Sequence, residues 1–543
     1  MAPKAAVSPA PPATKSESDP FLYVLRAMCI LELAAIYSSL SQLTLAPVYG
    51  SIPSSVFHDE ITSVIVLLSL TRTNFLSRYM PAKVEYYIPI LASSIPMIQS
   101  YLFKYSTKLG VESGPLLTEG LTYYPLLLMS TYSAARILLD AKIDQYLHAA
   151  MGSTILGLST YGFFVLVRSK SNLLISQFFA LSATFTRVSL QCVIGALFTI
   201  LSPSKLSLLA IPAMIHTTWF NPHFVSPHTD VLANSTLQAN QWNLLERAES
   251  NTGYISVLDN LDAGYRVLRC DHSLLGGEWL ITDERRRQGI TTSEPIYSVF
   301  EILEAVRLVE TSTSSAPDNE KSIGTAPKAL IAHGIDTTVV ELDPKVHEYA
   351  TKYFDLPSNH IAVLEDAVSW VQNASTSATK QYDYIIHDVF TGGAEPLPLF
   401  TNRFLGNLRS LLKPDGVVAV NYAGDLADSS TKQIINTINL AFDRQCRMFR
   451  DTEPSSEQSS ETEATDFLNM VIFCKNTVDG KLEFRAPEEL ELKFPTEEEM
   501  QEESVQTLTV DNLAEFEKKQ IDSAKKHWKI MRLVVPDFVW ELW

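Results

Sequence analysis

Acidic residues at the ends of two predicted strands are the side chains of this sequence best suited to chemistry. Residues 337–342 and 382–389 are apolar, β-branched runs, each bounded by turn residues and followed by a helix-length segment. Such alternation predicts βαβ units and a parallel sheet. Glu341 lies near the end of the first run and Asp388 near the end of the second. Because ligands bind outside the carboxyl ends of strands in an open α/β sheet, we expect both carboxylates to face one crevice.

Glu341 is the candidate for holding a nucleoside. A carboxylate has two acceptor oxygens and no donor, so it can accept both hydroxyl groups of a ribose. The alternative is that Glu341 and Asp343 cap the helix that begins at Pro344, since acids and proline favour the first turn of a helix. The capping role is favoured for Asp343, whereas the ligand-binding role is favoured for Glu341, which is still on the strand.

Composition excludes several classes of function. The 543 residues carry a net charge of −18 and their Lys and Arg are not clustered, so no nucleic-acid surface is expected. The five cysteines lack CxxC or CxxH spacing, and the eleven histidines lack an HExxH pattern. We therefore expect no metal site and no disulfide framework, with the thiols reduced and buried.

The first 220 residues are mostly apolar. After a leader over residues 1–20, rich in Ala, Pro, Ser and Lys and expected to be disordered, seven apolar segments recur between residues 21 and 220. A membrane-spanning helix needs about 20 apolar residues, and several segments reach that length. The pattern predicts six to eight transmembrane helices in an integral, multi-pass protein; an all-helical globular domain is the alternative. Basic residues in most of the short connections favour an amino terminus inside. The side of the C-terminal domain depends on the number of helices, and we expect it to be cytosolic.

The remainder of the chain predicts a mixed α/β part. Residues 254–258 and 265–270 alternate in character and flank an Asn, Asp and Gly turn, which predicts a β-hairpin. The predicted organisation is an α-helical transmembrane bundle at 21–220, a small β-hairpin domain at 240–295, an α/β Rossmann-like domain at 296–480 and an extension at 481–543.

Several motifs between residues 253 and 475 resemble the spermidine synthase (aminopropyltransferase) family. They are SLLGGEW in the hairpin, EPIY, VELDPKVHEYATKYF, LEDAVSWV, YDYIIHDVF followed by LPLF, and LKPDG. That family has a small β-domain followed by a Rossmann-like fold shared with class I methyltransferases. The resemblance covers less than half of the chain, and it implies S-adenosylmethionine or its decarboxylated form as a substrate, with no metal.

The resemblance also assigns roles to individual residues. It implies a contact to the ribose for Glu341, to the adenine edge for Asp366 and Ala367, and to the amine for Asp388, with Tyr297 shaping the amine pocket. A sulfonium carbon is already electrophilic, so the enzyme must deliver a neutral amine in line and take its proton, which a carboxylate can do. Tyr297 could equally be a packed aromatic, and Asp366 could also cap its helix.

Two departures from the family pattern bear on activity. Polyamine-forming members carry a second acid three residues after the base, whereas Asp388 is followed by Val, Phe and Thr. Gly324 is the glycine that remains of the cofactor turn, and the polar run at 311–321 is not expected to form a buried strand. Either activity has been lost, or the sequence lacks a short segment that encodes the strand; the second hypothesis is preferred.

The predicted function is aminopropyl transfer to a small-molecule amine, in polyamine biosynthesis, by an enzyme anchored in the lipid bilayer. One alternative is an S-adenosylmethionine-dependent methyltransferase, favoured by the missing second acid. The other is a non-catalytic membrane protein that keeps the fold, favoured by the incomplete first strand. The sequence is compatible with a homodimer and does not identify the acceptor.

Overall fold

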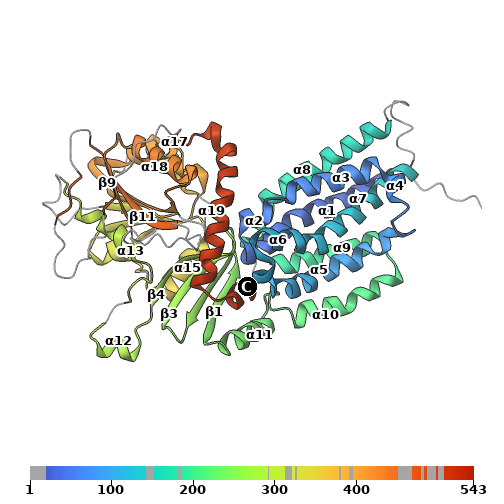
Figure 1. Cartoon of the computed structure of the whole chain (residues 1–543), viewed down its shortest axis with the longest axis horizontal. Helices are drawn as coiled ribbons and strands as arrows, with labels where there is room; N and C mark the ends of the chain where they lie inside the picture. Colours follow the sequence, from blue (N-terminus) through green and yellow to red (C-terminus); the bar gives the residue numbers. More distant parts are fainter. Residues whose placement is uncertain are drawn as a thin grey trace, which may run out of the picture.

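The amino-terminal half of the chain forms a bundle of helices around the long helix α1 (Figure 1). This computed structural model describes residues 20–141, 152–181, 185–290, 293–311, 321–323, 327–377, 381–389, 396–450, 467–477, 482–485, 497–498 and 507–543. The helices of this half are α1 Pro20–Tyr49, α2 Ser51–Ser55, α3 His58–Thr71, α4 Thr73–Leu76, α5 Ile88–Phe103, α6 Ser106–Leu121, α7 Tyr123–Asp140, α8 Gly152–Leu181, α9 Arg187–Leu201, α10 Ile211–Trp219 and α11 Pro227–Gln238. Apolar side chains of α1, α5, α7 and α9 share one buried cluster.

The prediction of six to eight transmembrane helices is wrong. Among the described residues, α1 is the one helix that is both long and apolar enough to cross a membrane, and 44% of its most apolar window is buried inside the protein. Other apolar segments form shorter helices, such as α5 with 16 residues and α9 with 15. The placement derived from that prediction, a multi-pass integral protein with a cytosolic C-terminal domain, is therefore withdrawn.

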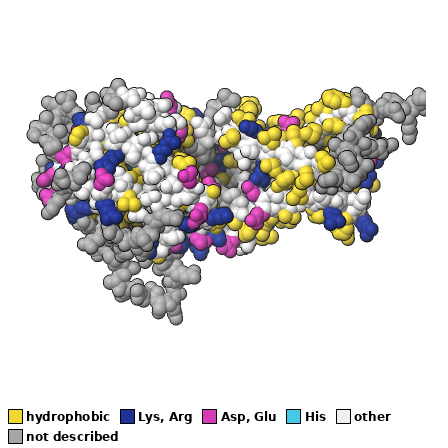
Figure 2. Space-filling view, turned by 90° about the horizontal axis from the view of Figure 1, so that it is seen from above, with side chains coloured by type: hydrophobic (Ala, Val, Ile, Leu, Met, Phe, Trp, Pro, Cys, Tyr) yellow, Lys and Arg dark blue, Asp and Glu magenta, His cyan; other side chains and the backbone are white. Residues whose placement is uncertain are grey.

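The apolar composition of the bundle misled the sequence interpretation because its helices carry hydrophobic residues on exposed as well as buried faces. Figure 2 shows hydrophobic side chains spread over the bundle, while many charged side chains lie over the α/β half. Polar groups also lie inside the bundle: the buried amides of Gln99 and Gln191 hydrogen-bond to each other at 3.0 Å. Hydropathy along the chain does not record which side chains pair in this way.

Four antiparallel strands follow the bundle in the order β1-β2-β3-β4. They are β1 Trp242–Glu249, β2 Tyr254–Asn260, β3 Tyr265–Cys270 and β4 Ser273–Trp279, and the short helix α12 Asp283–Arg287 comes next. The hairpin predicted from the sequence is present as β2 and β3, paired from Ile255 with Cys270 to Asn260 with Tyr265. The β1–β2 turn reaches toward the main sheet, and this contact becomes important at the candidate site.

The rest of the chain builds an eight-stranded sheet, counted over the described residues, in the order β12-β10-β11-β9-β8-β5-β6-β7. Its strands are β5 Lys321–Ile323, β6 Asp336–Val340, β7 Ile361–Val363, β8 Tyr382–His387, β9 Leu412–Asp425, β10 Cys446–Arg450, β11 Phe467–Lys475 and β12 Glu497–Glu498. The associated helices are α13 Ser298–Glu304, α14 Pro327–Ala332, α15 Pro344–Tyr353, α16 Ala367–Ser377, α17 Asn402–Ser410 and α18 Ser429–Ala441. Strands β5 to β9 run parallel and β11 runs antiparallel to β9, so the predicted Rossmann-like fold of this part is confirmed.

The first strand of this sheet is present but short. β5 spans three residues and lies between β6 and β8, with Ser322 paired to Thr337 on one side and Tyr384 on the other. The polar residues that precede Lys321 are thus not needed to fill the central position. From β5 the sheet is extended on one side by β6 and β7 and on the other side by β8 and β9. The topological switch point therefore lies between β5 and β8.

The carboxyl-terminal helices pack between the two halves of the molecule. Helix α19 Leu513–Val534 lies between the bundle and the sheet (Figure 1), and α20 Asp537–Glu541 follows it. The indole nitrogen of Trp528 donates to the Val48 carbonyl at 2.9 Å, and the Arg269 guanidinium donates to the carbonyls of Val539 and Pro47, each at 2.7 Å. These contacts hold the carboxyl-terminal segment against both halves of the molecule.

The expectation that all thiols are reduced is wrong for two of them. Cys446 and Cys474 form a disulfide that joins β10 to β11. The two residues are direct cross-strand partners in the antiparallel ladder, with Cα atoms 4.1 Å apart. Their 28-residue sequence separation gave no sign of this pairing, because register is fixed by the sheet rather than by local spacing.

Candidate functional site

The carboxyl ends of β6, β7 and β8 place three predicted site residues at one edge of the sheet. Glu341 follows β6, Asp366 lies shortly after β7, and Asp388 follows β8. Since these strands run parallel on either side of the switch point, their carboxyl ends lie along the same edge of the sheet. The grouping expected from the sequence at this edge is therefore present in the fold, and the ligand roles of the residues stay predictions.

Glu341 is held in an environment that disfavours its charge. Burial raises its pKa to about 7, and the nearby carboxylates of Asp343 and Asp388 add to the rise. The backbone amide of Asp343 partly opposes it by donating to Glu341 Oε1 at 2.9 Å. Further hydrogen-bond donors or a positive charge close to this carboxyl group would stabilise its ionised form.

Asp343 caps α15, as predicted, and it also binds the β1–β2 turn. Its Oδ1 accepts from the backbone amide of Lys345 at 2.8 Å and from Ser250 Oγ at 2.5 Å. Its Oδ2 accepts from Thr252 Oγ1 at 2.6 Å. Asp343 is fully buried, so these donors satisfy a charge that would otherwise be costly to bury. The small β-sheet is thereby fixed against the carboxyl edge of the main sheet.

Asp366 is exposed and acts as the N-cap of α16. Its carboxylate accepts from the backbone amide of Ser369 at 3.1 Å and from Ser369 Oγ at 2.7 Å. Ala367 is the first residue of that helix. Capping and a contact with the adenine edge are compatible, because a helix N-terminus presents additional backbone amides to a ligand.

Asp388 is half-buried and is oriented by a residue that the sequence interpretation missed. Asn421 of β9 donates its Nδ2–H to Asp388 Oδ1 at 2.7 Å. His387 pairs with Val420, so the next pair along the two parallel strands brings Asp388 beside Asn421. The sequence does contain one indication of this role, because Asn421 is the single amide in the apolar run VVAVNYA of β9. It lies level with the end of the neighbouring strand β8.

Tyr297 lies in a different environment from the acidic group. It is the N-cap residue of α13, its ring packs 6.3 Å from that of Phe300, and it belongs to two buried apolar clusters. Burial raises its pKa to about 12, with a smaller contribution from Tyr265. These neighbours favour the packed-aromatic interpretation. Gly324 lies outside the described residues.

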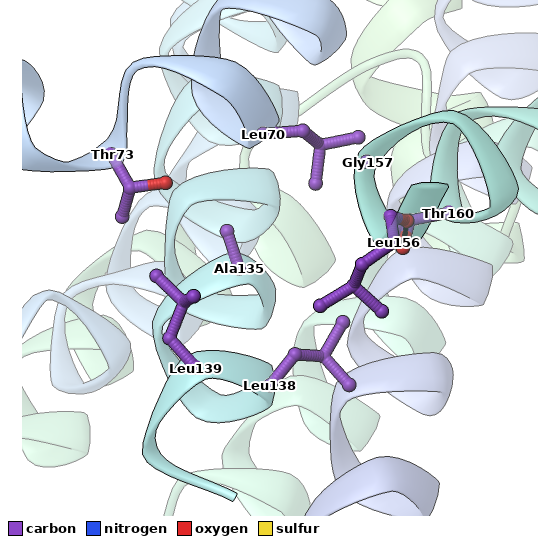
Figure 3. A pocket seen from close by; sticks show the side chains of 8 residues that line it. All are labelled: Leu70, Thr73, Ala135, Leu138, Leu139, Leu156, Gly157 and Thr160. Carbon is purple, nitrogen blue, oxygen red and sulfur yellow. Dashed lines mark hydrogen bonds between the residues drawn. The ribbon is translucent and has the colours of Figure 1, made fainter. Parts of the chain in front are cut away.

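A small cavity lies inside the helical bundle, away from this edge of the sheet. Its volume is about 30 Å³ (Figure 3), which is room for about one water molecule. Its wall is largely apolar and consists of Leu70, Thr73, Ala135, Leu138, Leu139, Leu156, Gly157 and Thr160. No group of three or more His, Cys, Asp or Glu side chains within the described ranges is arranged to hold a metal ion.

Comparison with known proteins gives one match along the whole chain and several partial ones. The N-terminal histidine N-methyltransferase of Emericella nidulans is 40% identical over 564 aligned positions, covering 97% of this chain and 99% of that protein. The Spermine/spermidine synthase domain family matches residues 324–455. The polyamine aminopropyltransferase of Vibrio vulnificus is 34% identical over 85 residues, covering 15% of this chain and 28% of that protein. A crystal structure of spermidine synthase from Thermotoga maritima aligns with 44% of this chain and 74% of its own, at 18% identity and a TM-score of 0.31.

These matches confirm part of the sequence interpretation and correct another part. The spermidine-synthase-type domain is confirmed, and so is S-adenosylmethionine or its close relative as the kind of substrate. The assignment to polyamine biosynthesis is corrected, because the protein that matches the full chain is an N-methyltransferase, whereas the aminopropyltransferase shares only a short segment. By its end-to-end similarity, the chain belongs to the family of the N-terminal histidine N-methyltransferase.

Proposed function

We propose that this protein transfers a methyl group from S-adenosylmethionine to a nitrogen of an amino-terminal histidine in a peptide or protein. The observation that carries the proposal is the 40% identity to a relative of that activity along 97% of the chain. The absence of an acid three residues after Asp388 supports it. Polyamine-forming enzymes need a second acid to hold a diamine, and the chain has Val, Phe and Thr after Asp388.

The acidic edge of the sheet fits a cationic nucleoside. Glu341 would accept the ribose hydroxyls, and the group of Glu341, Asp343 and Asp388 gives the crevice a negative potential that favours a sulfonium. When bound, S-adenosylmethionine supplies an electrophilic methyl carbon whose bond to sulfur breaks with the electron pair leaving on sulfur. The residues of this chain must therefore position the acceptor nitrogen and receive its proton.

We assign the uptake of this proton to Asp388. Its Oδ1 is fixed by Asn421, which holds the carboxylate plane against rotation. An oriented carboxylate can accept an N–H of the acceptor, align the nitrogen lone pair with the methyl carbon and take up the proton as the new bond forms. This requires no metal and no covalent enzyme intermediate.

A transfer assay on the full chain tests the proposal. Three peptides are compared: one with an amino-terminal histidine, the same peptide acetylated at its amino terminus, and one with the histidine moved inside. Each is incubated with S-adenosylmethionine and, separately, with the decarboxylated nucleoside, and the products are identified by mass spectrometry. We expect one added methyl group on the first peptide only. Aminopropyl addition, or no transfer to any peptide, would contradict the proposal.

Replacement of the base gives an independent check. Asp388→Asn should lower kcat by about 10²–10⁴-fold, because general-base assistance is lost, while S-adenosylhomocysteine still binds with its normal affinity by calorimetry. Asp283→Asn is the matched control, since the Asp283 side chain on α12 is 93% exposed. Full turnover by Asp388→Asn would remove Asp388 from the mechanism.

A further inference from the structure

Asn421 is a buried amide whose two ends have different surroundings. The residue is 6% exposed on β9, next to the end of β8. Its Nδ2 donates to Asp388 Oδ1 at 2.7 Å, while its Oδ1 is buried and has no hydrogen-bond partner among the described residues. A buried carbonyl oxygen without a donor is costly, so its presence beside the proposed base calls for a functional explanation.

The orientation of this amide is fixed by chemistry. If the amide were rotated by half a turn, Oδ1 would face the Asp388 carboxylate, and two acceptors would then stand at hydrogen-bond distance with no proton between them. Nδ2 must therefore point at Asp388. The acceptor oxygen is left beside the carboxylate, at the carboxyl edge of the sheet where the acceptor substrate would bind.

We infer that Asn421 forms the second half of the acceptor subsite, with Oδ1 receiving an N–H of the substrate while Asp388 receives another. The inference rests on the proposed function and specifies its substrate class: an acceptor with two N–H donors close together and no more than one positive charge. An amino-terminal histidine has this pair in its ring N–H and its α-amino group. An internal histidine has a neutral backbone amide in place of the α-amino group, with the preceding residue attached to it, and a diamine would meet a neutral amide in place of a second acid.

The transfer step balances with these contacts. The lone pair of the acceptor nitrogen forms the new bond to the methyl carbon, and the carbon–sulfur bond breaks with its electron pair going to sulfur. The methylated nitrogen is the ring nitrogen that carries no hydrogen, so the proton leaves from the other ring nitrogen and passes to the Asp388 carboxylate, while Asn421 gains or loses no proton. Asn421 thus binds and orients the substrate, and it acts on the proton transfer only through Asp388.

Two variants separate the two ends of the amide. Asn421→Ala removes both contacts and should raise KM for the amino-terminal histidine peptide by about tenfold or more, with S-adenosylhomocysteine affinity unchanged. Asn421→Asp has nearly the same shape and keeps an acceptor oxygen, but it removes the donor to Asp388. Two adjacent carboxylates then compete for one proton, so the acid limb of the kcat/KM profile should move to higher pH while KM at high pH stays close to the wild-type value.

Asn74→Asp, an exposed amide on α4 of the bundle, is the matched control and should leave the kinetic constants and the pH profile unchanged. The inference is overturned if Asn421→Ala has the wild-type KM and Asn421→Asp the wild-type pH profile. Should Asn421→Ala fail to fold, the shape-conserving Asn421→Asp still decides. If the wild-type protein methylates no peptide, the proposed function fails and the inference fails with it. If the wild-type protein is active and the Asn421 variants have its KM and its pH profile, the inference alone fails.

Discussion

Glu341→Gln is the substitution whose consequences the structure specifies most fully. Burial and the neighbouring acids raise the pKa of Glu341 from an ordinary value of 4.5 to about 7. Each pKa unit corresponds to 1.36 kcal/mol, so ionising this carboxyl in the ligand-free protein costs about 3 kcal/mol. Glutamine has nearly the same shape and cannot ionise, and it therefore avoids this cost.

The sign of the pH effect follows from the raised pKa. Between pH 4.5 and 7 the folded protein holds a proton on Glu341 that the unfolded chain has released, so the stability contributed by this group is fully present below pH 4.5 and is lost as the pH rises through 7. We expect the free energy of unfolding of the wild type, relative to Glu341→Gln, to fall by about 3 kcal/mol between pH 4.5 and pH 8. Chemical denaturation at a series of pH values, without ligand, measures this difference.

Ligand binding should favour the ionised form of Glu341, in contrast to the ligand-free protein. Ribose hydroxyls donate to the ionised carboxylate, so the nucleoside must expel the proton, and binding near pH 7 should release about half a proton per site. Calorimetry of S-adenosylhomocysteine binding in buffers of different ionisation enthalpy reports that number. Affinity should fall about tenfold per pH unit below pH 6 in the wild type and be nearly independent of pH, although weaker, in Glu341→Gln.

The matched control is Glu348→Gln on α15, where the acid is half-exposed and pairs with Lys345 on the surface. Its unfolding curves should follow those of the wild type at every pH, because exposed pairs contribute less than about 1 kcal/mol. The reasoning is refuted if Glu341→Gln has the same pH dependence of stability as the wild type, or if nucleoside binding releases no proton.

Two further substitutions test the framework that holds the site. Arg187→Ala leaves the buried carboxylate of Glu249 without its partner and should lower the free energy of unfolding by about 3–5 kcal/mol, measured by chemical denaturation. Arg168→Ala, at the solvent-accessible pair with Asp59, should lower it by less than about 1 kcal/mol, and equal losses would contradict the expectation. Removal of the disulfide by changing both Cys446 and Cys474 to Ser should cost about 3–4 kcal/mol for a loop of this length, and an unfolding midpoint that a reductant leaves unchanged would contradict the expectation.

The acidic edge of the sheet could be predicted from the sequence because it depends on local patterns. Apolar runs that end in Glu341 and Asp388 define both the strands and the side to which their carboxyl ends point. Asn421 could not be found in the same way. Its role depends on the register between β8 and β9, which brings it beside a residue 33 positions earlier in the chain.

The bundle was predicted as helical but placed in the wrong class. Segment length and hydropathy do not show how polar residues pair across helices. His58 of α3 lies within 2.8 Å of Glu119 of α6 and 2.7 Å of Ser38 of α1, all three fully buried. The two contacts join residues that are 20 and 61 positions apart in the chain. The sequence therefore contains these polar groups without showing that they form hydrogen bonds with one another.

A chain of buried contacts connects this bundle to the candidate site. Arg187 of α9 forms an ion pair with Glu249 at the end of β1, and the next residue, Ser250, donates to Asp343. The amide of Asp343 in turn donates to Glu341, the proposed ribose ligand. Removing the bundle would remove the guanidinium that pairs with Glu249 and would loosen the turn that fixes Asp343. The geometry of the candidate site therefore depends on the docked bundle, and this dependence gives a physical reason why the similarity to the methyltransferase relative extends over both halves of the chain.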